Sequence, residues 1–184
     1  SRRVTAISEN HIAGGYQENN PAKHVMVHNA MQAIRREKGT FQHGKAPILM
    51  ETLPLLADML SGSDLVTLRD KALLFLGFAG AFRRSELVAV QIEDLTFTTQ
   101  GMVVFIPQSK GDQLGAGSEI AIPYAPQKEI CAVRAVRNWM EAAGITSGPL
   151  FRGFKRNLQP RDTQLNDKAV AEIVKKRFNV HTRK

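Results

Sequence analysis

The apolar run at residues 65–80 constrains the fold of this chain more than any other segment. Its hydrophobic residues fall on nearly every side of a helix, a pattern typical of a helix buried at the centre of a domain. The most apolar part, residues 72–82, is broken by Gly77 and Gly80 and is shorter than the about 20 apolar residues that span a bilayer. We therefore expect other elements to cover this helix, and a chain of 184 residues suffices for such a core.

Hydrophobic periodicity predicts helices on both sides of this run and strands after it. Helical spacing of apolar residues indicates helices at residues 2–16, 21–38, 52–60, 85–92, 126–143 and 165–178. Enrichment in β-branched and aromatic residues, or polar–apolar alternation, indicates strands at residues 95–98, 102–107 and 118–124. We interpret residues 152–164 as a basic, irregular loop. The predicted fold class is therefore α+β and mainly helical, with a small three-stranded antiparallel sheet.

Residues 39–47 (GTFQHGKAP) divide the chain into two parts. They hold few core-forming side chains and two glycines, which is typical of a linker between domains. We predict a helical domain in residues 1–38 and a separate domain in residues 48–184.

The charge balance favours a polyanionic partner. Lys and Arg number 25 against 17 Asp and Glu, which gives a net charge of +8. Nucleic acid is the commonest partner of such a chain, and an anionic membrane surface is the rival. The single cysteine, Cys131, rules out a disulfide framework and favours a reducing cytoplasm, and no signal peptide is visible.

Two adjacent arginines, Arg83 and Arg84, lie where the apolar helix ends and the next helix begins. A guanidinium can hold two phosphate oxygens at once, and Glu86 is close enough along the chain to orient one of the two. A solvated charge pair at a helix start is the alternative. Lys110, near the tip of the predicted hairpin, could donate a proton in a cleft or could simply aid solubility.

Further basic residues cluster near the junction of the two predicted domains. Contacts of this kind with phosphates give salt-dependent affinity rather than choice of sequence. The predicted DNA-binding residues are Arg2, Arg3, Arg35, Arg36, Lys38, Lys45 and Arg84, and Lys155, Arg156 and Arg161 of the late loop could add to them.

Three motifs in this order resemble the tyrosine recombinase, or phage integrase, family. GAFRRSELVAVQIEDL resembles the first arginine box of that family, and VFIPQSKGDQLG resembles its β-hairpin. CAVRAVRNWMEAAGI followed by GPLF resembles the helix and turn that come next. Residues 1–38 resemble the last helices of the core-binding domain, and residues 48–184 resemble the first part of the catalytic domain.

The resemblance implies DNA recombination without metal or cofactor. In the family a tyrosine attacks a phosphate of double-stranded DNA, arginines stabilise the transition state, and a lysine protonates the leaving oxygen. By resemblance Arg83 is the catalytic arginine and Lys110 the catalytic lysine, and copies of the protein associate on DNA.

His24 and His28 have metal-ligand spacing, but no third ligand stands out, so we assign them to a helix surface.

The chain departs from the family pattern at its late motifs. The family places a His-x-x-Arg box and then a tyrosine after the last helix, whereas His181 is followed three residues later by Lys184. Tyr16 and Tyr124 are the only tyrosines, and neither matches the nucleophile. We expect a DNA-binding fragment of a recombinase that is inactive alone. A DNA-binding remnant without catalysis and a helical protein-interaction module are the alternatives.

Overall fold

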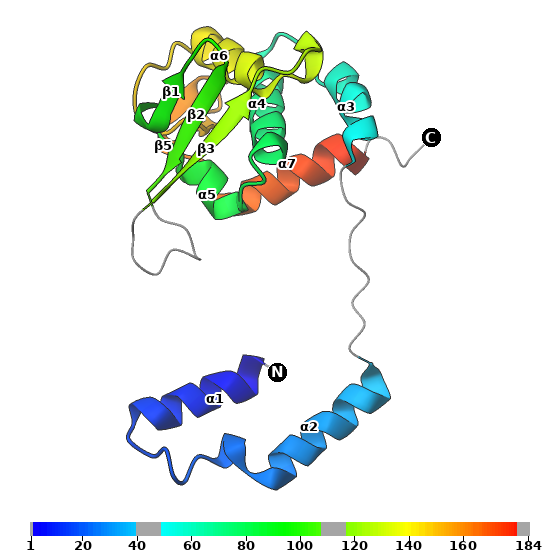
Figure 1. Cartoon of the computed structure of the whole chain (residues 1–184), viewed down its shortest axis with the longest axis vertical. Helices are drawn as coiled ribbons and strands as arrows, with labels where there is room; N and C mark the ends of the chain where they lie inside the picture. The colour runs from blue at the N-terminus through cyan, green and yellow to red at the C-terminus, as the bar shows by residue number, and fades with distance from the viewer. Residues whose placement is uncertain (1, 40–48, 108–116, 180–184) are drawn as a thin grey trace. The chain divides into compact units, whose positions relative to one another are not determined.

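The computed structural model describes residues 2–39, 49–107 and 117–179, which fall into two compact units (Figure 1). The first unit is Ser1–Pro47 and the second is Ile48–Lys184. The predicted linker lies outside the described residues except for Gly39, and so does the tip of the predicted hairpin.

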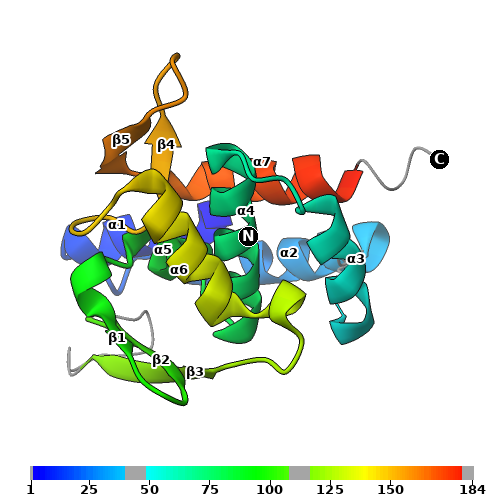
Figure 2. The ribbon, with the colours of Figure 1, turned by 90° about the horizontal axis from the view of Figure 1, so that it is seen from above.

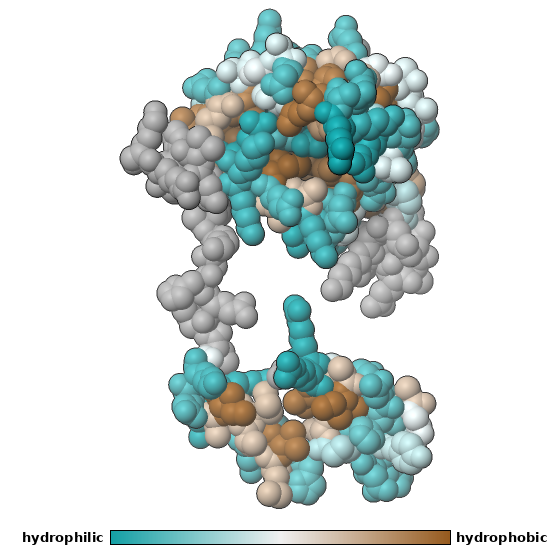
Figure 3. Space-filling model, turned by 180° about the vertical axis from the view of Figure 1, so that it is seen from behind, coloured by the Kyte–Doolittle hydropathy of each residue, from teal (hydrophilic) through white to brown (hydrophobic). Residues whose placement is uncertain are grey.

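The first unit consists of α1 (Arg2–Ala13), a turn of 3₁₀ helix η1 (Pro21–Lys23) and α2 (Val25–Lys38). Asn20 joins them, because its amide donates to the hydroxyl and carbonyl oxygens of Ser8 at 3.0 and 3.2 Å. The same side chain accepts a bond from the N–H of Ala22 at 3.1 Å. Neither helix has a buried residue. Apolar side chains therefore lie on the surface of this unit, as Figure 3 shows.

The second unit is built around α4 (Leu65–Ala79), the helix that the apolar run predicts. Ala72, Leu73, Phe75 and Leu76 of α4 are buried. The helix packs against α6 (Ala132–Ala143), which lies beside it in Figure 2, and it lies between α6 and α7 (Asp167–Asn179) in Figure 1. Within the described residues, no helix is both long and apolar enough to cross a membrane.

Two short helices complete the helical part of this unit. The first, α3 (Leu53–Met59), follows the 3₁₀ turn η2 (Met50–Thr52) and contacts α7. The second, α5 (Arg84–Ala89), follows α4 directly and also contacts α7. A further 3₁₀ turn, η3 (Ile92–Asp94), leads into the sheet.

The predicted three-stranded antiparallel sheet is confirmed. Its strands are β1 (Leu95–Phe97), β2 (Gly101–Ile106) and β3 (Ser118–Pro123), in the order β1-β2-β3. Val104, in the middle of β2, lies opposite Leu95 and Ile120. Val104 and Ile106 are buried whereas Phe105 between them is exposed, so one face of the sheet covers the core.

The prediction of an irregular loop at residues 152–164 is wrong. Two strands, β4 (Arg152–Phe154) and β5 (Pro160–Gln164), pair there as an antiparallel hairpin. The sequence PRDTQ of β5 is too polar to show a strand pattern, and the pairing depends instead on hydrogen bonds. Leu158 turns the chain with a positive φ of 61°, and the Lys155 N–H donates to the Gln159 carbonyl oxygen at 2.9 Å.

The long helix predicted from residue 126 begins later. A 3₁₀ turn, η4 (Lys128–Ile130), comes first, and Cys131 then has an extended backbone with φ −78° and ψ 112°. This conformation interrupts the helical hydrogen bonds, so α6 begins at Ala132. Cys131 is fully buried, as a small apolar residue would be.

Candidate phosphate-binding site

Arg83 lies at a sharp break between two helices. The N–H of Gly80 donates to the Leu76 carbonyl oxygen at 3.0 Å and ends α4, and Ala81 then adopts a positive φ of 49°. A side chain at Gly80 would meet the Phe82 ring, so glycine lets that ring pack closely against the turn. Arg83 is extended and precedes the first residue of α5. The sequence therefore sets the arginine at the end of the central helix.

One carboxylate, that of Glu86, holds both the backbone and the side chain of Arg83. The backbone N–H of Arg83 donates to Oε2 of Glu86 at 2.9 Å, and Nη1 donates to Oε1 at 2.6 Å. The Arg83 side chain is 55% exposed and that of Glu86 is 13% exposed. The guanidinium is therefore oriented by a largely buried carboxylate while it faces the solvent, where it can meet an anion.

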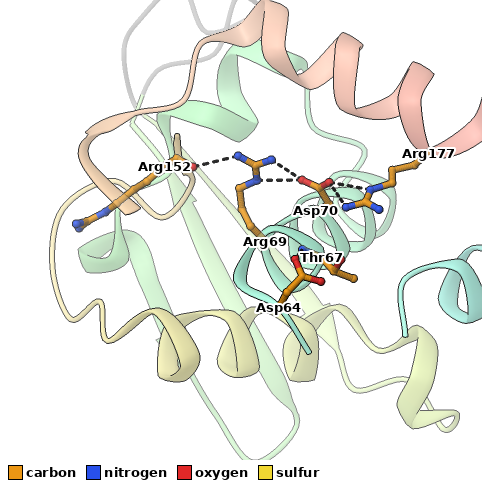
Figure 4. Close-up of polar contacts among 6 residues, drawn as sticks. All are labelled: Asp64, Thr67, Arg69, Asp70, Arg152 and Arg177. Carbon is orange, nitrogen blue, oxygen red and sulfur yellow. Dashed lines mark hydrogen bonds and ion pairs between the residues drawn. The ribbon is translucent and has the colours of Figure 1, made fainter. Parts of the chain in front are cut away.

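A buried ionic cluster lies in the middle of α4 (Figure 4). Oδ1 of Asp70 accepts from Nε and Nη2 of Arg69 at 3.0 and 2.6 Å. Oδ2 of Asp70 accepts from Nε of Arg177 on α7 at 2.8 Å, and Nη2 of Arg177 lies 2.7 Å away. We call Arg69, Asp70 and Arg177 the ionic cluster. Sequence analysis missed it, although an Arg-Asp pair inside an apolar helix signals a buried ion pair.

The ionic cluster extends to the β4–β5 hairpin. Nη1 of Arg69 donates to the Arg152 carbonyl oxygen at 3.3 Å, and its guanidinium carbon lies 4.9 Å from the centre of the Phe154 ring. Phe154 in turn meets Trp139 of α6 edge-on, with ring centres 6.1 Å apart. The ionic cluster thus ties α4 to α7 and to β4. It therefore helps to hold in place the helix at whose end Arg83 lies.

Two exposed carboxylates have lowered pKa values because they accept hydrogen bonds. The hydroxyl and the backbone N–H of Thr67 lower the pKa of Asp64, which caps α4. The backbone N–H of Gly148 lowers the pKa of Glu93, to whose oxygens it donates at 2.9 and 3.2 Å. These bonds favour the ionised carboxylates. They hold the turn before α4 against that helix and hold Gly148 against η3.

The other predicted site residues belong to different units or lie outside the described residues. Arg84, the first residue of α5, is exposed beside Arg83. In the first unit, exposed positions on α1 and α2 hold Arg2, Arg3, Arg35, Arg36 and Lys38. Lys45 and Lys110 lie outside the described residues, as does His181.

The two histidines at the start of α2, His24 and His28, make local contacts. Nδ1 of His24 accepts from the N–H of Met26 at 3.2 Å and caps the helix, and Nε2 of His28 lies 2.9 Å from Nε2 of Gln32. In the part of the chain that the structure describes, no three His, Cys, Asp or Glu side chains are grouped to hold a metal ion.

The comparison with known proteins identifies the family. The fold and site define a mainly helical α+β domain with a carboxylate-held arginine at the end of its central helix. No model of a known protein family matches the chain. It is 67% identical over 177 residues to the integrase/recombinase xerD homolog of Selenomonas ruminantium, across 96% of this chain and 52% of that protein. The chain belongs to the tyrosine recombinases and spans about half the length of this curated relative.

Proposed function

We propose that this chain binds double-stranded DNA and is part of a recombinase that exchanges DNA strands through a phosphotyrosyl link. The identity of 67% over 96% of the chain to an integrase/recombinase carries this proposal. The net charge of +8 supports a DNA partner. Copies of the complete protein would assemble on DNA, and the single cysteine favours a cytoplasmic setting.

In this proposal Arg83 binds the phosphate that is attacked. A guanidinium carries its N–H donors in one plane, so the 2.6 Å bond from Nη1 to Glu86 fixes the plane in which it meets two phosphate oxygens. Positive donors held in place before the reaction stabilise the charge that develops in the transition state. Lys110 would protonate the leaving 5′ oxygen.

The exposed basic residues of α1 and α2, with Lys45 and Arg84, would contact DNA phosphates. The tip of the β4–β5 hairpin, with Lys155 and Arg156, is exposed and would add to this surface. These contacts would bind the duplex without selecting a sequence.

A DNA-binding role without chemistry is the second candidate for this chain by itself. Its two tyrosines are Tyr16, which is exposed on the first unit, and Tyr124, which packs beneath Arg134 with 5.1 Å from guanidinium carbon to ring centre. Packing against Arg134 suits a structural tyrosine better than a nucleophile. The tyrosine of the reaction would then come from another part of the complete protein.

DNA binding by the chain can be tested by fluorescence anisotropy with a labelled duplex over a range of salt concentrations. We expect log K to fall linearly with log salt, with a slope of about 0.9 for each phosphate contacted. Replacing Arg35 and Arg36 by Gln should reduce the slope by about 1 to 2. Replacing Glu18 and Glu37 by Gln is the matched control and should not reduce the salt slope. Affinity that does not depend on salt would contradict the proposal.

The role of Arg83 can be tested in the complete recombinase with a suicide DNA substrate that traps the covalent intermediate. Arg83→Ala should reduce trapping by about 10²- to 10³-fold while binding changes little, because the lost donor acts in the transition state. Arg84→Ala, the adjacent arginine, is the control: it removes a DNA contact only, so trapping per bound duplex should be retained. Equal losses for the two variants would remove Arg83 from the catalytic role.

A further inference from the structure

A basic cleft lies at the start of α4, at the end of the helix away from Arg83. Its volume is about 240 Å³. Three elements and one loop form it: α4, η4, α6 and the turn before α4. The polar residues that line it are Ser61, Ser63, Lys71, Lys128, Arg134 and Asn138.

The cleft gathers positive charge. Lys71, Lys128 and Arg134 all line it, and among the described residues no Asp or Glu belongs to the lining. The ion pairs among the described residues engage Arg69, Arg83, Arg152 and Arg177, and none engages a cation of this cleft. Cations that face one space repel each other, and a bound anion relieves that repulsion. The charge pattern therefore fits an anionic ligand.

The side chain of Arg134 is held in place before any ligand binds. Nη1 donates to the Ala125 carbonyl oxygen at 3.0 Å, and the guanidinium lies on the Tyr124 ring. Lys71 is also restrained, because its Nζ lies 5.8 Å from the centre of the Phe75 ring. Both cations are half-buried, so an anion between them would be partly shielded from water. The neutral groups of the cleft would add hydrogen bonds.

The helix terminus itself does not make the site. Asp64 caps α4 by accepting from the Thr67 N–H at 3.0 Å, and its carboxylate is not part of the lining. The cleft is built from side chains of several elements. It is also separate from Arg83, because Lys71 lies eight residues before Ala79, or about 12 Å along the axis of α4, and Arg83 lies beyond the end of that helix.

We propose that the basic cleft binds a phosphate dianion, free or at the end of a small phosphorylated molecule. The cleft is smaller than the pockets of about 300 to 1,000 Å³ that hold drug-sized ligands, so its size suits a single phosphate group. Three positive charges match a dianion better than the single charge of a DNA phosphodiester. The phosphate site is therefore distinct from the DNA surface proposed above and does not depend on it.

The test is a titration of the ¹⁵N-labelled chain with inorganic phosphate, followed by NMR at constant ionic strength. We expect saturable shifts at the amides of Gly62, Ser63 and Asn138. Lys71→Gln and Arg134→Gln should each weaken binding about tenfold, because each removes a charge-assisted hydrogen bond. Arg137→Gln is the matched control. It lies on the same helix with its guanidinium 4.5 Å from the centre of the Phe97 ring, outside the cleft, and should leave binding unchanged.

Shifts that do not saturate, or an equal loss in Arg137→Gln, would mean charge screening only and would overturn the proposal. A second arm adds a short duplex to the phosphate-loaded chain. Phosphate shifts that persist support a separate site, whereas displacement of phosphate from the cleft by DNA would overturn it. Lys128→Gln, at an exposed position of η4, tests the cleft again if either half-buried variant fails to fold.

Discussion

The ionic cluster makes Asp70→Asn the most informative single change for stability. The Asp70 side chain is 2% exposed and accepts from Arg69 and Arg177, each through two nitrogens, at 2.6 to 3.0 Å. Asn keeps the shape but loses the charge and turns an NH₂ group toward one guanidinium. Two arginines would then face each other with no carboxylate between them.

The cost can be worked from this geometry. Breaking a buried pair by removing one partner costs about 3–5 kcal/mol. The side chain of Arg177 is 18% exposed and can turn part of its charge toward water, whereas Arg69 at 8% cannot. We therefore expect Asp70→Asn to lower the free energy of unfolding by about 3 kcal/mol, the lower end of that range.

Urea denaturation followed by circular dichroism measures this loss as a lower midpoint with an unchanged slope. Asp162→Asn is the control, because Asp162 is 90% exposed and lies 3.7 Å from Arg152, a pair worth under about 1 kcal/mol. If the free energy of unfolding of Asp70→Asn stays within about 1 kcal/mol of that of the parent chain, the ionic cluster does not hold α4 to α7 and β4.

Two further changes test local contacts. Glu86→Gln should lower DNA cleavage by the complete recombinase about tenfold with little change in stability, because Arg83 loses a charged partner. An unchanged rate in the trapping assay would exclude a role for Glu86 in orienting Arg83. Asp64→Ala should cost about 1 kcal/mol at neutral pH, because α4 loses its cap. Thr67 lowers the folded-state pKa of Asp64 from 3.8, so the cap contributes above that value and is lost as pH falls below it. Urea midpoints of parent and variant should therefore converge in acid.

The buried central helix and the Arg83 break could be predicted because both signals are local. The apolar run places α4, and glycine followed by arginine marks its end. The ionic cluster depends instead on Asp70 meeting Arg177, 107 residues later in the chain. A periodic pattern carries no information on such a pair, and can indicate only that Arg69 and Asp70 need partners.

The elements that the sequence misassigned are those in which tertiary contacts override local preference. The polar strand β5 pairs with β4 partly because Nε of Arg161 donates to the Phe154 carbonyl oxygen at 3.0 Å. The start of α6 is delayed because the fully buried Cys131 is extended. Hydrogen bonds decide the backbone conformation of β5, and burial in the core decides that of Cys131.

Three consecutive residues of α4 meet three different neighbours. Successive side chains on a helix differ by about 100° around its axis. Arg69 reaches β4 and Asp70 reaches α7, so two bonds fix the rotation of α4, and Lys71 is thereby turned toward the basic cleft. That rotation also sets where the chain leaves the helix at Gly80 and presents Arg83.

Loss of the ionic cluster should therefore affect Arg83 as well as stability. In the complete recombinase, Asp70→Asn should lower DNA cleavage per folded molecule, because α4 no longer has a fixed partner on α7. Trapping of the covalent intermediate, normalised to the folded fraction from circular dichroism, measures this effect. Full cleavage per folded molecule would mean instead that Glu86 alone positions Arg83, through its bonds of 2.6 and 2.9 Å.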